Sequence, residues 1–209
     1  ALSHSETRIV ICGEAQRDLL AEAQKLHACN LVVVPAEASG IAWPKPDVVG
    51  DLPAAPAAGT QGLLMYTSGT TGRPKGVVHT HASLMAGGWT TAIAHELTPN
   101  DNAYCVLPHY HINGLCVTVM APLVSGGRVA MAERFSASRF WDEVQSSQAT
   151  WFSVVPTIIS HLLQGETPAP EAVRAVKFGR SASAPLSPDV HEAFESRFGI
   201  PIVETMGLT

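Results

Sequence analysis

Glycine and hydroxyl residues dominate the segment YTSGTTGRPKG, which spans residues 66–76. Glycine lets backbone N–H groups approach an anion closely, and serine and threonine hydroxyls donate hydrogen bonds to phosphate oxygens. Lys75 adds a compact positive charge, and Pro74 stiffens the chain before it. The composition therefore predicts a loop that cradles phosphate groups. Its candidate ligands are Thr67, Ser68, Gly69, Thr70, Thr71, Gly72 and Lys75.

Other phosphate and nucleophile motifs do not fit. A Walker A loop places serine or threonine directly after its lysine, whereas Gly76 follows Lys75 here. The G-x-S-x-G pattern of an α/β-hydrolase nucleophile does not occur. A polar turn between two strands is the plain alternative to a phosphate loop.

Alternate histidines occur twice, as His79 and His81 in HTH and as His109 and His111 in HYH. Alternate residues of a strand share a face, so each pair could in principle meet one metal ion. Cys105 precedes His109 by four residues, but no carboxylate completes a set nearby. The sequence therefore favours packing or pocket roles over a structural zinc site.

The composition restricts the class of protein. Of the 209 residues, 46% are hydrophobic and 15% charged, with 13 Lys and Arg against 18 Asp and Glu, which argues against disorder and gives no electrostatic footprint for nucleic acid. The most apolar stretch, residues 115–124, is far shorter than the roughly 20 residues of a membrane span. Cys12, Cys29, Cys105 and Cys116 form no C-x-x-C pair, which predicts buried thiols in a reducing, cytoplasmic compartment.

These segments need a scaffold, and the hydrophobic pattern predicts alternating strands and helices. A strand at residues 7–12, a helix at 14–28 and a strand at 31–34, closed by Pro35, predict a parallel strand–helix–strand unit, because parallel strands need a crossover. Residues 35–59 are rich in Pro, Ala and Gly and predict a surface connection.

The rest of the chain predicts an α/β fold with helices on both faces of the sheet. The candidate phosphate loop then lies at the carboxyl end of a strand, where such folds bind ligands. Ser136 and Ser187 are predicted N-caps, and Gly199 is a predicted helix end. Strands are predicted at 62–67, 77–80, 103–107, 128–131, 150–155, 173–179 and 201–203, and helices at 81–97, 114–124, 136–146, from 156 onward and at 188–198.

The segment YTSGTTGRPKG resembles the signature loop of the adenylate-forming, or AMP-binding, enzymes. This family includes acyl-CoA synthetases, firefly luciferase and the adenylation domains of peptide synthetases. Its loop holds the β- and γ-phosphates of ATP while a carboxylate attacks the α-phosphate, and in the CoA ligases coenzyme A then displaces AMP. The resemblance implies mainly parallel sheets flanked by helices, as in the large N-terminal domain of acyl-CoA synthetases.

Three further segments carry the same resemblance. LPHYHINGL at 107–115 is similar to L-P-x-[FY]-H-x-x-G-L, which implies that His111 lies near the acyl carboxylate and the phosphates, with Gly114 beside the acyl pocket. RSASAPL at 180–186 resembles the S-G-A-A-P-L turn along the adenine, and VETMGLT at 203–209 resembles a segment ending in Y-G-x-T-E. The implied adenine neighbours are Ala182, Ser183, Ala184, Glu204, Thr205 and Met206, and Thr209 is implied at the α-phosphate.

Two of these positions depart from the family pattern. Ala182 stands where the family has glycine, and Met206 stands where it has a tyrosine stacked on the adenine. Methionine still offers a polarizable contact, so the resemblance implies that nucleotide binding is retained.

The resemblance implies an ATP-dependent acid–thiol ligase that uses ATP, Mg²⁺ and coenzyme A on a small carboxylic acid. The chain is expected to be a partial N-terminal AMP-binding domain, with the strand–helix–strand unit and connection in 1–60 and the nucleotide and acyl region in 61–209. The acidic Mg²⁺ ligand is expected beyond Thr209, as is a C-terminal domain with its lysine. The isolated 209 residues are therefore expected to be inactive.

Two alternatives remain open. One is an adenylation domain that loads a carrier protein, and the other is a non-catalytic nucleotide-binding relative, for which Met206 is a hint. The acid itself is not specified, because no arginine or lysine stands out as the partner of a second carboxylate. Homodimerisation is left open as well.

Overall fold

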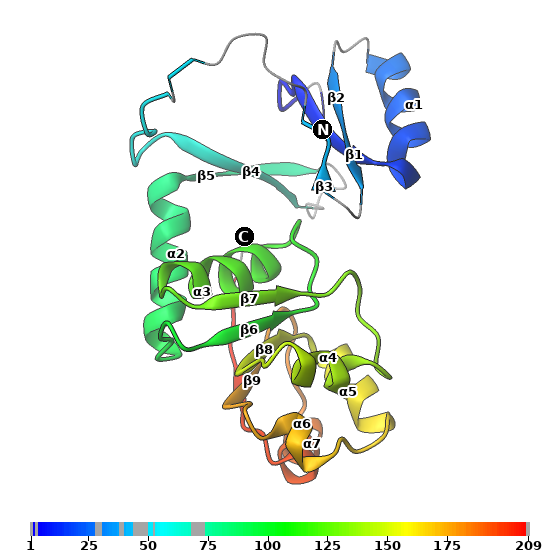
Figure 1. The fold of residues 1–209 in the computed structure, drawn as a ribbon, viewed down its shortest axis with the longest axis vertical. Helices are drawn as coiled ribbons and strands as arrows, with labels where there is room; N and C mark the ends of the chain where they lie inside the picture. Colours follow the sequence, from blue (N-terminus) through cyan, green and yellow to red (C-terminus); the bar gives the residue numbers. More distant parts are fainter. Residues whose placement is uncertain are drawn as a thin grey trace. The chain divides into compact units, whose positions relative to one another are not determined.

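A computed structural model describes residues 2, 4–27, 31–37, 40–43, 50–51, 53–67 and 74–207. The chain divides into two compact units, residues 1–56 and residues 57–209. The second unit contains a five-stranded parallel sheet flanked by helices (Figure 1), which confirms the predicted α/β class.

The first unit is a small sheet with one helix. Strand β1 (Ile9–Gly13) leads through a 3₁₀ turn, η1 (Glu14–Gln16), into α1 (Arg17–His27) and back to β2 (Val32–Glu37). β1 and β2 run parallel, so the predicted strand–helix–strand unit is confirmed. A short strand, β3 (Gly40–Ile41), pairs antiparallel with β2 inside the segment predicted as an irregular connection.

Strand β2 passes through Pro35, so the predicted end of the strand at this residue is wrong. The carbonyl oxygen of Pro35 accepts a hydrogen bond from the N–H of Ala42 at 2.9 Å. The strand therefore forgoes only the bond that the proline nitrogen cannot donate.

The second unit begins with a hairpin. Strands β4 (Gln61–Thr67) and β5 (Lys75–Thr80) pair antiparallel, with Thr67 opposite Lys75. The predicted strand before the phosphate loop is thereby confirmed as β4, but this strand pairs with β5 in the hairpin and does not belong to the parallel sheet. Helix α2 (His81–Ala94) follows directly, three residues shorter than predicted.

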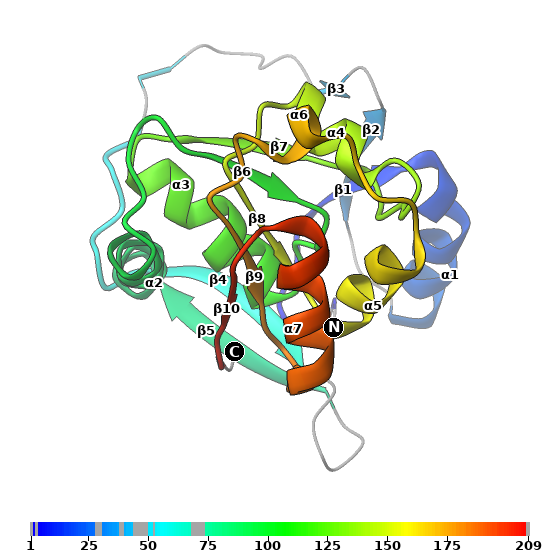
Figure 2. The ribbon, with the colours of Figure 1, turned by 90° about the horizontal axis from the view of Figure 1, so that it is seen from below.

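The five-stranded sheet has the order β10–β9–β8–β6–β7, and every neighbouring pair is parallel. Helices cover both faces of this sheet (Figure 2). The strands are β6 (Asn102–Cys105), β7 (Arg128–Met131), β8 (Trp151–Val154), β9 (Phe178–Ser181) and β10 (Ile202–Glu204).

One face of the sheet packs against α4 (Phe140–Ser146), α5 (Pro156–Gln164) and α7 (Pro188–Phe198). A short helix, α6 (Pro170–Val173), contacts α4. The other face lies under α2 and a segment predicted as a single helix. That segment is a π-helix, η2 (Asn113–Met120), continued by α3 (Ala121–Val124).

The register of the strands sorts side chains between the two faces, because successive residues of a strand point to opposite sides. Tyr104, Phe152, Gly179 and Ile202 form one row across β6, β8, β9 and β10. Phe152 is wholly buried in the aromatic core, and a Cβ at Gly179 would lie 2.5 Å from its ring. This row therefore belongs to a fully packed face.

The adjacent row points to the other face, at the carboxyl end of the strands. It consists of Cys105, Ser153 and Arg180, which lie in register on β6, β8 and β9. All three side chains are buried. The side of the sheet under η2 is therefore polar where the strands end.

Two elements begin later than predicted. Helix α4 begins at Phe140, because the hydroxyl of Ser136 bonds to that of Ser138 at 3.3 Å instead of capping a helix. The strand predicted at 173–179 is β9, which starts only at Phe178, because Pro170 opens the helix α6 in front of it.

The two ends of α7 follow the sequence. The Ser187 hydroxyl accepts a hydrogen bond from the N–H of Val190 at 3.3 Å, and Gly199 ends the helix with a φ of +67°. Both predictions are confirmed, as is the predicted start of α5 at Pro156.

Candidate active site

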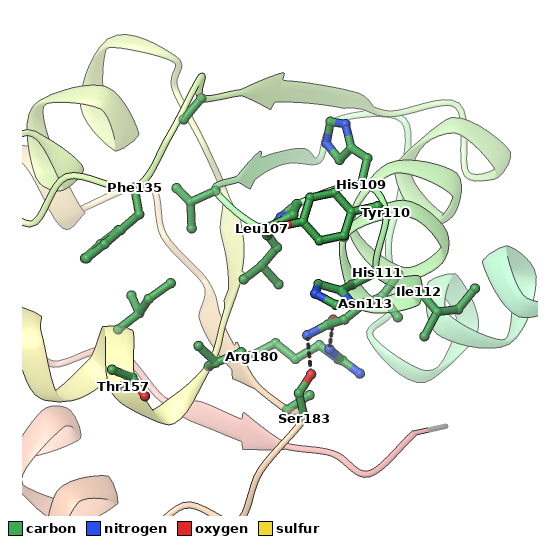
Figure 3. Close-up of a pocket in the computed structure, with 18 of the residues that line it drawn as sticks. Leu107, His109, Tyr110, His111, Ile112, Asn113, Phe135, Thr157, Arg180 and Ser183 are labelled. Atoms are coloured by element: carbon green, nitrogen blue, oxygen red, sulfur yellow. Dashed lines mark hydrogen bonds between the residues drawn. The ribbon is translucent and has the colours of Figure 1, made fainter. Parts of the chain in front are cut away.

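A cavity of about 1060 Å³ opens at the carboxyl ends of β6, β7, β8 and β9 (Figure 3). Its wall is built by segments that follow these four strands and by Gly207 after β10, at the end of the sheet where open α/β folds bind ligands. The wall combines apolar side chains with histidines and arginines. Among its residues are Leu107, His111, Asn113, Gly114, Arg134, Phe135, Arg180, Ala182, Ser183 and Gly207.

The segment after β6 brings both predicted acyl-pocket residues to this wall. The N–H of His111 donates to the carbonyl oxygen of Pro108 at 3.1 Å, and the exposed imidazole lies 4.7 Å from the ring of Tyr110. Gly114 is buried, and a Cβ there would collide with the carbonyl oxygen of Pro108. Only glycine permits this close approach, while the roles of His111 and Gly114 toward an acid stay predictions.

The turn after β9 forms another side of the cavity. Ala182, which stands where the resemblance expects glycine, is 3% exposed and keeps a negative φ. The left-handed residue is Ser183 instead, with a φ of +74°. Ala182 and Ser183 line the cavity, whereas Ala184 is exposed and does not.

The end of β10 supports this turn. A carboxylate oxygen of Glu204 accepts a hydrogen bond from the N–H of Leu186 at 2.9 Å, and the N–H of Thr205 donates to the carbonyl oxygen of Ser181 at 2.9 Å. Met206 is 94% exposed. These three predicted adenine neighbours lie beside the turn but outside the cavity lining, which Gly207 joins.

The predicted phosphate ligands are divided by what the structure describes. Thr67 and Lys75 end the two strands of the β4–β5 hairpin directly opposite each other, and Lys75 is exposed. Their hairpin leads into the loop from both sides. The candidates Ser68, Gly69, Thr70, Thr71, Gly72 and Thr209 lie outside the described residues.

A buried polar network that the sequence did not reveal connects the floor of the cavity to the turn. Arg180 Nη1 donates to Asn113 Oδ1 at 2.6 Å and to Ser153 Oγ at 3.2 Å, and Asn113 Nδ2 donates to Ser183 Oγ at 3.3 Å (Figure 3). Asn113 is the first residue of η2, a helix type often found at functional sites. Only the position of Arg180, directly before the predicted turn, could have pointed to this network.

Burial governs the electrostatics of this network. It lowers the pKa of Arg180 to about 10, which leaves the guanidinium charged at neutral pH. Burial, followed by the positive charge of Arg180, lowers the pKa of His95 as well. The ring of His95 lies 5.1 Å from that of Phe178 at the amino end of the same face.

The cysteines and histidines form no metal site among the residues that the structure describes. Cys12, Cys105 and Cys116 are free and buried, as predicted, and Cys29 lies outside the described part. Cys105 Sγ lies 3.6 Å from His109 Nε2.

The premise that His79 and His81 share a strand face is wrong. His79 lies on β5, whereas His81 is the first residue of α2.

Across the described residues, no helix combines the length and apolar character needed to cross a membrane.

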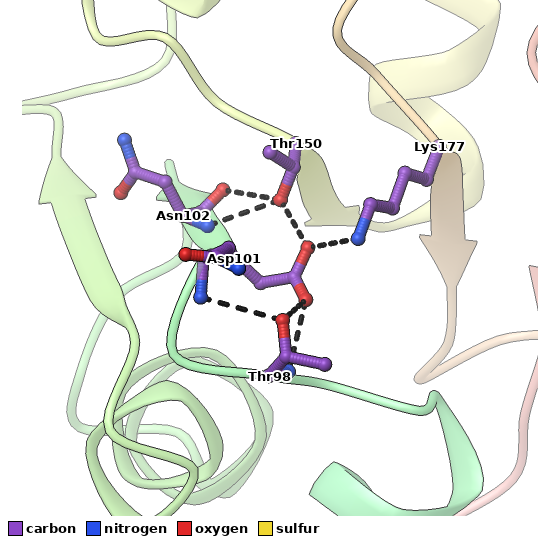
Figure 4. A network of polar contacts seen from close by, with 6 residues as sticks. Thr98, Asp101, Asn102, Thr150 and Lys177 are labelled. Carbon is purple, nitrogen blue, oxygen red and sulfur yellow. Dashed lines mark hydrogen bonds and ion pairs between the residues drawn. The ribbon is translucent and has the colours of Figure 1, made fainter.

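A different polar network joins the amino-terminal ends of three strands of the sheet (Figure 4). Asp101, 1% exposed, accepts hydrogen bonds from Thr150 Oγ1 at 2.8 Å and from the N–H and hydroxyl of Thr98 at 2.9 Å, and it pairs with Lys177 Nζ at 2.7 Å. Burial opposes the charge, but these partners outweigh it and hold the pKa of Asp101 at about 2. Asp101, Thr150 and Lys177 each directly precede a strand, so one carboxylate ties together the starts of β6, β8 and β9.

The whole chain, residues 1–209, matches the model of a family described as AMP-binding enzyme. The chain belongs to this family. The resemblance seen in its four motifs is thereby confirmed.

Two curated members of the family are similar to this chain. A sulfoacetate–CoA ligase from Cupriavidus necator is 49% identical, over all of this chain and 41% of its own length. An oxalate–CoA ligase from Arabidopsis thaliana is 37% identical, over 70% of this chain and 29% of its own length. The chain thus spans about two fifths or less of these relatives.

Solved structures of family members share the fold. A malonyl-CoA ligase in a ternary product complex with methylmalonyl-CoA and AMP superposes with a TM-score of 0.81 at 28% identity, covering 100% of this chain and 43% of that one. ATP-bound MatB from Rhodopseudomonas palustris gives a TM-score of 0.80 at 27% identity, covering 99% of this chain and 41% of that one.

Proposed function

We propose that this chain is part of an ATP-dependent acid–CoA ligase, which converts a carboxylic acid into an acyl-adenylate with release of pyrophosphate and then into a CoA thioester. The observation that carries the proposal is the cavity at the carboxyl ends of the strands. It brings the segment with His111 and Gly114 together with the turn at Ala182 and Ser183, in a chain of the AMP-binding family.

We propose distinct roles for the motif residues. Thr67, Ser68–Gly72 and Lys75 hold the β- and γ-phosphates and spread the charge of the leaving pyrophosphate, while Thr209 contacts the α-phosphate. His111 positions the reacting carboxylate. The residues proposed to border the adenine are Ala182, Ser183, Ala184, Glu204, Thr205 and Met206.

Mg²⁺ is proposed to neutralise phosphate charge when it is bound with ATP. No group of three acidic, histidine or cysteine side chains suited to a metal occurs in the described part of the chain. We propose the phosphate oxygens of ATP as ligands of the ion, and no step of the proposal depends on the ion's geometry.

The names of the relatives support a class of acid. Sulfoacetate, oxalate and malonyl groups are small, and each parent acid carries a second acidic group. We propose the same class for this protein. The three free buried thiols support a reducing compartment, and we propose the cytoplasm.

Acid-dependent exchange of pyrophosphate into ATP by the full-length protein tests adenylation, and thioester formation with coenzyme A tests the second step. Exchange is expected in the wild type and in Lys25→Ala, which alters an exposed lysine of α1. A Lys75→Ala, Thr70→Ala double variant is expected to lose it. Full activity in the double variant contradicts the loop assignment, and exchange without a CoA thioester points to another thiol acceptor.

A further inference from the structure

Arg180 places a positive charge inside the wall of the cavity. It is 6% exposed and lines the cavity from β9. Its neighbours in register are Ser153 on β8 and Val203 on β10, and neither carries a charge. The sheet itself therefore supplies no counter-ion.

The hydrogen bonds of Arg180 leave much of its donor capacity unused. Asn113 Oδ1 and Ser153 Oγ, both neutral acceptors, share the single nitrogen Nη1. The buried Nε has no partner. Among the described residues, no carboxylate lies within 4.0 Å of the guanidinium, although the exposed Glu133 lines the same cavity.

A buried guanidinium without a counter-ion opposes folding, so the site gains when an anion reaches it. The planar fork of N–H donors matches the oxygen pairs of carboxylate and sulfonate groups. Asn113 holds the fork in place from one side, and its amide also bonds to Ser183. The guanidinium is thus oriented before any ligand enters.

We propose that Arg180, positioned by Asn113 and Ser153, forms an anion-binding subsite that takes the second acidic group of the substrate. The proposal rests on the ligase function proposed above, in which the first carboxylate is activated. The ligands that fit are short dicarboxylates and short acids with a sulfonate. An acid with an uncharged end would leave the guanidinium unpaired, so the subsite selects against it.

The test compares malonate with its monomethyl ester, which has a similar size but lacks the second charge, in the exchange assay on the full-length protein. Arg180→Gln is expected to lower the preference for malonate, as a ratio of kcat/KM values, by about 100-fold. Arg174→Gln, which alters an exposed arginine after α6 that does not line the cavity, is expected to preserve the preference.

A second variant separates recognition from a merely structural role. Asn113→Asp offers Arg180 an internal carboxylate, so the melting temperature is expected to hold while the preference for malonate falls by about 10-fold. If Arg180→Gln and Asn113→Asp change both acids equally, the subsite is overturned while the ligase proposal stands.

If no acid supports exchange in the wild type, the ligase proposal fails, and calorimetric titration of malonate without ATP tests the subsite alone. Binding to the wild type that is lost in Arg180→Gln supports the subsite. Equal binding by the two proteins, or no binding to the wild type, overturns it.

Discussion

The two faces of the five-stranded sheet differ in packing and in charge. Under α4, α5 and α7, apolar side chains fill the space around Phe152, and even Gly179 has no room for a methyl group. At the carboxyl end of the other face, Arg180 keeps donors without acceptors. We infer that the packed face holds the strands in register, whereas the face with Arg180 leaves hydrogen-bond donors free to bind a ligand.

The largest expected effect comes from Phe152→Ala on the packed face. The ring lies 5.2 Å from that of Phe140 and 6.1 Å from that of Trp141, so its removal leaves a cavity among rigid neighbours. The free energy of unfolding is expected to fall by about 3–5 kcal/mol, measured by urea denaturation. A loss below about 1 kcal/mol would show that this face is not tightly packed.

Gly114→Ala tests whether the cavity side tolerates added volume. The new methyl group would meet the carbonyl oxygen of Pro108, so a loss of up to about 3 kcal/mol and lower exchange activity are expected. Gly165→Ala is the control, because a Cβ there has no neighbour closer than 3.5 Å. Equal stability of the two variants would contradict the close approach at Gly114.

Asp101→Asn tests the polar network that joins the starts of β6, β8 and β9. The pKa of Asp101 is lowered in the folded protein, so its contribution of about 2 kcal/mol is present above about pH 4 and lost as the pH falls toward 2. The wild type is expected to lose stability over this window, and the variant is expected to lose less. Denaturation curves between pH 2 and 7 measure it, with the exposed Asp142→Asn as control.

Arg180→Met tests whether the buried charge on the cavity side lowers the stability of the fold. Methionine removes an unpaired buried charge, and Asn113 Oδ1 still accepts from Ser153 Oγ at 3.2 Å. The free energy of unfolding is therefore expected to rise by about 1 kcal/mol, seen as a higher melting temperature. A loss as large as that of Phe152→Ala would show that Arg180 is a packing residue.

The smallest expected effect of the same variant is on His95. Burial keeps the pKa of His95 below its usual value near 6.5, and the charge of Arg180 lowers it further. Arg180→Met is expected to raise this pKa by a fraction of a unit, followed by NMR titration of the imidazole. An unchanged pKa would show that the two groups do not interact.

The sequence predicted the end of a helix correctly where a single capping residue determines it. Ser187 and Gly199 bound α7 as predicted, because a cap and a left-handed glycine act within a few residues. Ser136 failed as a cap, since another serine competes for its hydroxyl. Hydrophobic runs and periodicity predicted the order of the other strands and helices, with errors at their ends, but not β3 or α6.

Long-range pairing decides what the sequence left open. The hairpin of β4 and β5 depends on which strand each one meets, and no local pattern distinguishes it from two strands of a parallel sheet. Arg180 becomes a buried cation only because Ser153 and Asn113, 27 and 67 residues away, surround it. The motif residues of the cavity were visible from the sequence, but its charge was not.

The network around Asp101 has a consequence for how such a protein diversifies. One carboxylate ties together the starts of β6, β8 and β9, and the packed face holds the rest of these strands in register. Loops that leave the carboxyl ends can therefore exchange side chains, or change length, without shifting the register of the sheet. Substitutions at the carboxyl ends can therefore change the choice of substrate one residue at a time while the starts of the strands stay tied together.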